Sequence, residues 1–143
     1  MVGVGGVIID RERALLIRRG SEPLLGEWSI PGGTLELGET LEEGVARELR
    51  EETGLTVRVI ELIEVFDRIY VERTAGANEG KKGPRFHYVI VDYLCERLAG
   101  EAMAGSDVTD VAFATEEELT KYNLTETATR ILKKAFAMER RRR

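Results

Sequence analysis

The sequence is poor in the residues from which many nucleophilic and metal centres are built. Cys95 is the only cysteine and His87 the only histidine. A single cysteine excludes an intrachain disulfide, as is typical of the reducing cytoplasm, where we expect this protein. The apolar, strand-like surroundings of Cys95 indicate a buried structural thiol. A single histidine argues against a histidine-based relay, and we expect His87 to pack in a strand, with a substrate contact as the alternative.

Long apolar runs and an excess of positive charge are also missing. No run approaches the roughly 20 apolar residues that cross a membrane, and the N-terminus lacks the basic flank of a signal peptide. The net charge of −5 argues against broad nucleic-acid binding. A divalent metal can nevertheless bridge an acidic protein and a polyanionic small molecule. We interpret Arg140–Arg143 as a short frayed terminus rather than a nucleic-acid tail.

The 143 residues are enough for one domain, residues 1–143, and no repeat or linker divides them. Aliphatic and β-branched runs predict strands, apolar residues at helical spacing predict helices, and glycine with proline predicts loops. The predicted strands are 3–9 and 13–19 as a hairpin, one or two strands in 56–72, and 85–97 and 108–114. The predicted helices are 41–53, a turn at 116–119 and 125–139, and the predicted loops are 20–39 and 74–84.

The apolar pattern of strand 85–97 runs along both of its faces, so we expect the strand to be covered on both sides. Strands between two helices then predict an α/β fold, a three-layer α/β/α sandwich with a mixed β-sheet. The final helix is expected to turn Ile131, Leu132, Ala135 and Phe136 inward.

Helix 41–53 has clear end signals. Thr40 and Glu43 form a capping-box pattern at its start, and Gly54 stands where a helix stops. Gly44 lies inside the helix, at a cost of about 1 kcal/mol relative to alanine. Two explanations stay open for it: clearance for a loop or substrate near the carboxylates, or close packing of helix and loop.

Three carboxylates of this helix share one face. At about 100° per residue, Glu48, Glu51 and Glu52 fall within roughly a 100° arc, where like charges repel. A divalent metal would remove the repulsion, and carboxylate oxygens suit Mg²⁺ or Mn²⁺. The Gly32-Gly33 pair just upstream lets backbone groups approach a phosphate or metal closely. Such a cluster alone is weak evidence of function, and the adjacent loop strengthens it.

The stretch GTLELGETLEEGVARELREETGL, residues 33–55, resembles the Nudix box at every defined position. At average residue frequencies, a chance match is on the order of one in a billion per starting position. Paired strands before the box, WSIPGG leading into it, a long strand after it and a C-terminal helix are also similar to the Nudix hydrolase family.

The resemblance implies the Nudix fold and hydrolysis of a phosphoanhydride bond in a nucleoside diphosphate linked to another group. It implies that Glu48, Glu51 and Glu52 bind Mg²⁺, with Mn²⁺ as an alternative, and that the backbone carbonyl of Gly33 joins them. Metal-activated water would attack one phosphorus and a glutamate would take its proton. Glu52 and Glu48 rank first as that base and Glu51 third.

Glu39 and Arg47 are implied to be structural supports, and Glu39 precedes the helix where it could pair with Arg47. The candidate substrate contacts are less defined. Arg18 or Arg19 could reach a terminal phosphate, and the alternative is an exposed charge at the strand end. Trp28 could stack on a base, although we expect a packed loop anchor.

Two further segments are candidates for substrate binding. The loop Thr74–Pro84, with Lys81, Lys82 and Arg85 in or beside it, is either a lid or a hairpin tip. In the family, the region before the last helix often lines the base pocket, which points to Tyr122–Thr125.

ADP-ribose or a related sugar nucleotide is the first substrate expectation, because the chain looks similar to Nudix proteins grouped with ADP-ribose pyrophosphatases. Val71 stands where the larger ADP-ribose-cleaving group has a proline, so an intact or oxidised nucleoside triphosphate is the alternative. A non-catalytic nucleotide sensor and a plain acidic interaction domain are the remaining alternatives, and no box carboxylate is missing. The expected partner is a small nucleotide, without membrane, and a homodimer stays open.

Overall fold

The computed structural model describes residues 1–22, 24–73 and 82–143. The chain begins with the predicted hairpin of β1 (Val2–Asp10) and β2 (Arg13–Arg19), which pair antiparallel near the turn. Arg11 and Glu12 both have positive φ, 52° and 64°, as a type I′ turn requires of its two central residues. Only Ile9↔Ala14 and Asp10↔Arg13 pair, so the two strands separate and enter different parts of the sheet.

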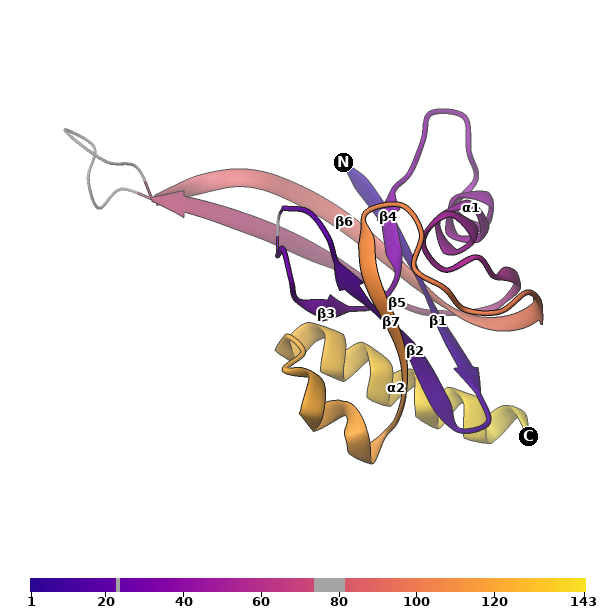
Figure 1. Cartoon of the computed structure of the whole chain (residues 1–143). Helices are drawn as coiled ribbons and strands as arrows, with labels where there is room; N and C mark the ends of the chain where they lie inside the picture. Colours follow the sequence, from indigo (N-terminus) through magenta and orange to yellow (C-terminus); the bar gives the residue numbers. More distant parts are fainter. Residues whose placement is uncertain (23, 74–81) are drawn as a thin grey trace.

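The sheet is mixed, as predicted. β1 lies parallel to β6 (Lys82–Ala99), which in turn pairs antiparallel with β5 (Thr56–Arg73). β2 pairs antiparallel with β7 (Val108–Thr115) and with the short β3 (Trp28–Ser29), while β4 (Gly32–Thr34) pairs with β1. β1 therefore lies at the centre, with the loop that carries β3 and β4 folded beside it (Figure 1).

Helix α1 (Leu41–Thr53) has the predicted ends. The Thr40 side chain accepts a hydrogen bond from the Glu43 N–H, the Glu43 side chain accepts one from the Thr40 N–H, and Gly54 has φ of 76°. These contacts satisfy backbone groups that a helix end leaves without partners. The buried side of α1 contributes Val45 and Leu49 to one of two apolar clusters, together with residues of β1, β2, β5 and β6.

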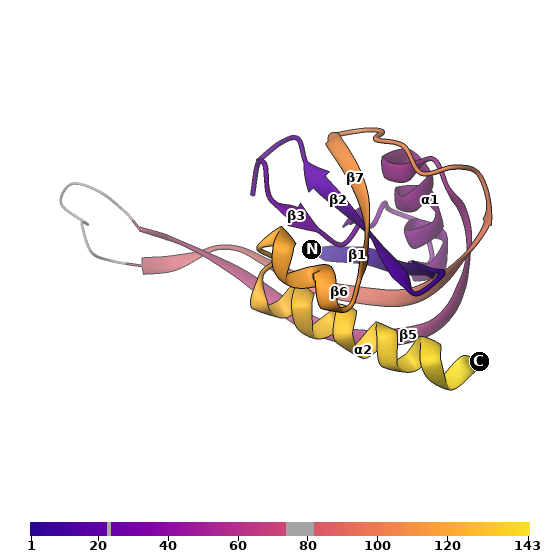
Figure 2. The ribbon, with the colours of Figure 1, turned by 60° about the horizontal axis from the view of Figure 1, so that its bottom comes forward.

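Helix α2 (Glu126–Arg142) packs on the opposite side of the sheet (Figure 2). Its N-terminus is capped by Thr125, whose side chain accepts from the Ala128 N–H at 3.1 Å. The predicted inward residues of α2 are all buried, and with Leu119 and residues of β1, β2, β5, β6 and β7 they form the second apolar cluster. Two helices on two sides of one mixed sheet confirm the three-layer α/β/α prediction.

The prediction that strand 85–97 is covered on both sides is wrong for its first part. β5 and β6 form a long hairpin that extends past both helices (Figure 1, Figure 2). Phe86 and Val89 are consequently exposed, whereas Val91 to Cys95 lie between the helices and are mostly buried. Of the predicted loop 74–84, residues 74–81 lie outside the described residues, and 82–84 belong to β6.

Three other predicted segments differ. Segment 20–39 is mostly loop but contains the short strands β3 and β4, and the turn at 116–119 is a 3₁₀ helix, η2 (Glu117–Tyr122). The frayed basic terminus is also wrong, because α2 continues to Arg142. Ion pairs hold this end: Arg140 Nη1 lies 3.0 Å from Glu116 Oε1, and Arg142 Nη1 lies 2.7 Å from Glu139 Oε1. None of the helices in the described ranges is long and apolar enough to cross a membrane.

Candidate active site

The Arg47 side chain joins helix α1 to the loop before it. Its Nε lies 2.6 Å from Glu39 Oε2, and its Nη2 donates to Glu39 Oε1 and to the Thr34 carbonyl, each at 3.0 Å. The Glu39 pairing predicted from the sequence is therefore present. Hydrogen bonding to Arg47 and to the Glu36 N–H lowers the pKa of Glu39. A charge-assisted, two-pronged contact of this kind fixes the geometry of both groups.

Glu48 lies between Arg47 and the backbone of Gly33. Arg47 Nη1 donates to Glu48 Oε1 at 2.8 Å. A side chain at residue 33 would overlap the Glu48 carboxylate, since a Cβ there would stand 2.5 Å from Glu48 Oε1. Gly33 thus allows the carboxylate to lie directly against the loop backbone. Burial raises the pKa of Glu48, and the hydrogen bond from Arg47 opposes that effect.

Glu52 is the most buried carboxylate of the helix, at 8% exposed. It accepts a hydrogen bond from the Gly32 N–H at 2.8 Å. Burial raises the pKa of Glu52 to about 7, the charge of Glu48 raises it further, and the Gly32 N–H and the charge of Arg19 act in the opposite direction. A carboxyl group with a pKa near neutrality can both hold and release a proton at ordinary pH.

Glu51 is the most exposed of the three carboxylates, and it shares the Nη1 atom of Arg47 with Glu48. It is 45% exposed, and its Oε2 lies 3.3 Å from Arg47 Nη1. Within the described residues, no three Asp, Glu, His or Cys side chains already form a metal-binding group. The three glutamates predicted as metal ligands are therefore neighbours without forming one metal-binding group: Glu48 and Glu52 meet the Gly32–Gly33 backbone, and Arg47 Nη1 contacts both Glu48 and Glu51.

The donor atoms at this place fit a hard divalent cation. Carboxylate oxygens and a backbone carbonyl are the ligands that such ions prefer, and several ligands are normally left as water. The residues that would hold the ion are Glu48, Glu51, Glu52 and the carbonyl of Gly33. Arg47 is the positive group that neutralises Glu48 and Glu51 here.

Gly44 packs closely against the preceding loop. A Cβ at residue 44 would lie 2.6 Å from Leu35 Cδ1, and Glu39 Oε1 and Val4 Cγ2 would be 3.3 Å away. Of the two explanations open for this glycine, close packing of helix and loop is the one that these contacts support. The loop they hold in place carries Glu39, which in turn holds Arg47.

The C-terminal end of α1 is bonded to a segment far along the chain. The carbonyls of Glu51, Glu52 and Thr53 accept hydrogen bonds from the N–H groups of Ser106, Gly105 and Met103, at 2.9 to 3.0 Å. Helix carbonyls at this end have no partner within the helix. Segment 103–106 supplies those partners, and sequence reasoning gave no sign of it.

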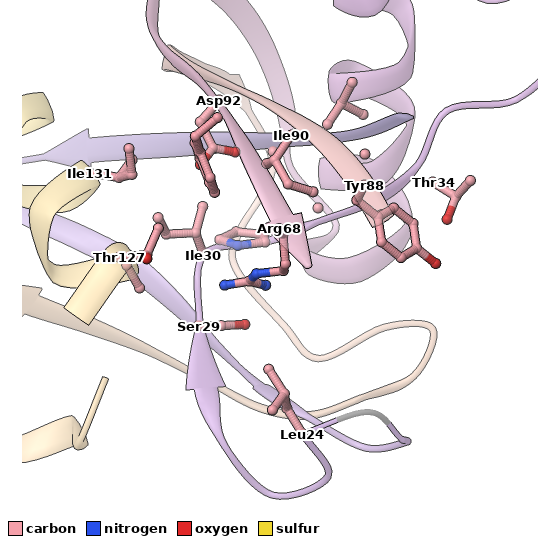
Figure 3. Close-up of a pocket in the computed structure, with 18 of the residues that line it drawn as sticks. Leu24, Ser29, Ile30, Thr34, Arg68, Tyr88, Ile90, Asp92, Thr127 and Ile131 are labelled. Atoms are coloured by element: carbon pink, nitrogen blue, oxygen red, sulfur yellow. The ribbon is translucent and has the colours of Figure 1, made fainter. Parts of the chain in front are cut away.

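A cavity of about 180 Å³ opens on the α2 side of the sheet, next to the Gly32-Gly33 pair (Figure 3). Its walls come from β1, β5, β6, the loop around β3 and β4, and the start of α2. The residues that line it include Gly5, Arg19, Phe66, Arg68, Tyr88, Ile90, Asp92, Thr127 and Ile131. Since Gly32 and Gly33 also line it, the cavity and the Glu48–Glu52 pair share the same two residues of backbone.

Of the four candidate substrate contacts, Arg19 is the one that lines this cavity. Arg18 points elsewhere, and its Nε donates to the Gly26 carbonyl at 3.0 Å. Trp28 packs edge-on against Tyr122 with ring centroids 5.1 Å apart, the packed anchor that was expected. The expectation that His87 packs in the strand is wrong: it is 55% exposed, outside the cavity, and bonded to Asp67 at 2.9 Å.

Sequence reasoning missed the polar residues of the cavity itself. Asp92 and Arg68 line it, and so does Thr127, from the first turn of α2 rather than from the segment 122–125 before that helix. A signal for Asp92 was present in the sequence, since it is the one charged residue in the otherwise apolar run VIVDYL. The predicted structural thiol, Cys95, is buried, and burial raises its pKa to about 12.

Comparisons with known proteins agree with this geometry. The model of the NUDIX domain family matches residues 1–135. An ADP-ribose pyrophosphatase of Methanocaldococcus jannaschii is 35% identical over 112 residues, which are 78% of this chain and 60% of that protein. A MutT-like protein of Streptomyces ambofaciens is 37% identical over 121 residues, 84% of this chain and 67% of that protein.

Among solved structures, a MutT Nudix hydrolase from Burkholderia pseudomallei superposes with a TM-score of 0.73 and 30% identity. The superposition covers 93% of this chain and 95% of that one. The chain thus spans nearly the whole of this structural neighbour, and its matched stretch spans 60% of the length of the Methanocaldococcus relative.

Proposed function

Because the chain belongs to the Nudix hydrolase family, we propose that it hydrolyses a phosphoanhydride bond in a nucleoside diphosphate linked to a second group. The observation that carries this proposal is the position of Glu48 and Glu52 against the Gly32–Gly33 backbone, at the edge of a cavity of about 180 Å³. A diphosphate lying over that backbone would place its bridging oxygen beside the carboxylates and its nucleoside in the cavity.

Hydrolases of this family generally need a divalent metal ion, and we propose Mg²⁺, with Mn²⁺ as a substitute. Glu48, Glu51, Glu52 and the Gly33 carbonyl would hold it. A bound ion lowers the pKa of water and neutralises charge on the phosphate oxygens. Arg47 and Glu39 fix the helix against the loop, and Arg19 lies where it can balance further phosphate charge.

The protein group that takes the proton from water is ranked by position. Glu52 ranks first, because it is buried, accepts a hydrogen bond from the loop backbone and has a pKa of about 7. Glu48 is second, since Arg47 already donates to it. Glu51 is third, because it is turned toward Arg47 on the exposed side of the helix.

ADP-ribose or a related sugar nucleotide is the first substrate candidate, supported by the name of the Methanocaldococcus relative. A nucleoside triphosphate, intact or oxidised, is the second candidate, because Val71 stands where the larger ADP-ribose-cleaving group has proline and so counts against a strict ADP-ribose assignment. A nucleotide sensor without catalysis is the weakest candidate, because all three box carboxylates are present.

The test is a hydrolysis panel with Mg²⁺ over ADP-ribose, sugar nucleotides, dinucleoside polyphosphates, and canonical and oxidised triphosphates, with products identified in H₂¹⁸O. We expect turnover of at least one substrate class that disappears on chelation. Glu52→Gln should abolish that turnover with the fold intact by circular dichroism, while Glu42→Gln, an exposed site on the same helix, should retain it. Activity that survives chelation, or full activity in Glu52→Gln, would contradict the proposal.

A further inference from the structure

We propose that Asp92 recognises the nucleobase, and that the cavity selects a base whose edge presents two adjacent N–H donors, as the guanine edge does. The inference rests on the proposed function, because it takes the ligand of the cavity to be a nucleotide. It assigns a role to a residue outside the box that the hydrolytic chemistry does not use.

Asp92 is a buried acid that faces a cavity. It lies in the middle of β6, is 4% exposed and lines the pocket beside Ile90 and toward Ile131 (Figure 3). No donor among the described residues makes a hydrogen bond to its carboxylate, and no fully enclosed side-chain oxygen in them lacks a partner, so the Asp92 oxygens open into the cavity. A ligand or water in the cavity would supply the hydrogen-bond partner that a buried polar group nearly always has.

The chain makes room for this carboxylate. A Cβ at Gly5 would lie 2.3 Å from Asp92 Oδ1, and the Pro31 carbonyl would be 3.2 Å away. Any side chain at residue 5 would therefore displace Asp92 from its position at the cavity wall. The carboxylate thus sits against the same β1 and loop backbone that leads to Gly32 and Gly33, on the opposite side of the sheet from α1.

The rest of the cavity suits a flat apolar ring. Phe66, Ile90 and Ile131 form apolar walls, and the Arg68 side chain extends into the same space (Figure 3). Binding sites of this composition orient a ligand through a few polar groups among apolar surfaces. Here the buried acid is placed to orient the base, and Arg19 and the Gly32–Gly33 backbone lie toward the phosphates.

The chemistry of a carboxylate determines which base fits. Burial raises the pKa of Asp92 to about 6, and the charge of Arg68 lowers it against that effect, so the group is ionised at pH 8. An ionised carboxylate only accepts hydrogen bonds, and its two oxygens can accept from a pair of parallel donors. The guanine edge offers N1–H and the exocyclic amine side by side, whereas adenine offers one donor beside one acceptor. Oxidation of guanine at C8 leaves this edge unchanged.

The binding of mononucleotides tests the inference without turnover. Titration calorimetry at pH 8 without metal would compare GMP, IMP, AMP and dGMP. We expect GMP to bind at least about tenfold more tightly than AMP, because a site built for donors rejects analogues that lack them. IMP, which lacks the exocyclic amine, should fall between the two. dGMP should bind as GMP does.

The variant Asp92→Asn supplies the decisive comparison. An amide offers one donor and one acceptor, so the preference of GMP over AMP should fall at least tenfold and turn toward AMP. Asp67→Asn, on the opposite face of the same hairpin, is the matched control and should leave the preference unchanged. The inference would be overturned if all four nucleotides bound equally or if Asp92→Asn left the preference for GMP over AMP unchanged. It would also be overturned if dGMP bound more weakly than GMP, since that would show recognition of the ribose instead of the base. Hydrolysis of nucleotides without base preference would refute the role of Asp92 and leave the proposed function intact.

Discussion

Asp92→Asn should stabilise the free protein at alkaline pH. Folded Asp92 ionises near pH 6 because burial opposes its charge, whereas in the unfolded chain it ionises near its ordinary value of 3.8. Folding therefore takes up a proton between those values, and the stability contributed by this group is lost as pH rises from about 4 to about 6. Asparagine has the same shape and carries no charge, so it avoids the cost.

The magnitude follows from the two pKa values. Each pKa unit corresponds to about 1.4 kcal/mol, so the difference between 3.8 and about 6 amounts to about 3 kcal/mol at pH 8. At pH 4, where the folded group is protonated and the unfolded one about half protonated, the same linkage leaves less than about 1 kcal/mol. Arg68 and Glu64 on β5 act on this value in opposite directions, Arg68 favouring the charged form.

Urea unfolding of both proteins at pH 8 and pH 4, followed by circular dichroism, measures the difference at each pH. The difference between the free energies of unfolding of the two proteins at one pH cancels the titration of the groups that they share, including Glu52. Asp67→Asn removes an exposed carboxylate from β5, and its free energy of unfolding should change by less than about 0.5 kcal/mol. An Asp92→Asn protein that is no more stable at pH 8, or equally stabilised at both pH values, would refute the reasoning.

Two further substitutions test the support of the site. Gly44→Ala places a Cβ 2.6 Å from Leu35 Cδ1, the end of a half-exposed side chain that can move, and 3.3 Å from Glu39 Oε1 and Val4 Cγ2. Because the shift of these neighbours outweighs the better helix propensity of alanine by a small margin, urea unfolding should show a loss of up to about 1 kcal/mol; a gain would show that the loop yields freely. Arg47→Ala removes the counter-charge of Glu39, Glu48 and Glu51, and we expect a loss of about 2–3 kcal/mol. Millimolar MgCl₂ should restore part of that loss of stability. The control Arg50→Ala, on the exposed side of the same helix, should leave the free energy of unfolding nearly unchanged. If MgCl₂ did not change the stability of Arg47→Ala, the role assigned to Arg47 would be contradicted.

Local patterns in the sequence predicted most of the elements. The ends of α1 followed from Thr40, Glu43 and Gly54, because capping depends on residues within one turn. The inward face of α2 followed from helical spacing in the same way. The pairing of Glu39 with Arg47 was also predicted, since Glu39 lies just before the helix and Arg47 follows within its first two turns.

Contacts between distant segments could not be predicted in this way. The exposure of Phe86 depends on where both helices stop along the β5–β6 hairpin, which no pattern within the strand encodes. Asp92 meets Gly5 only because β1 and β6 run parallel in one register. The orientation of Glu51 toward Arg47 is a choice among rotamers, and helical spacing fixes only the face on which that residue lies.

The connection between β6 and β7 is an unsuitable place to lengthen or cut the chain. Surface connections usually tolerate insertions, but here the stretch around Gly105 is bonded to the final turn of the helix that carries Glu51 and Glu52. A Cβ at residue 105 would lie 1.9 Å from the Glu51 carbonyl oxygen, so only a residue without a side chain fits against the end of the helix at this position. Fusion tags, engineered loops and circular permutants opened at this point would loosen the end of the helix that carries the carboxylates of the proposed site, about fifty residues away in sequence.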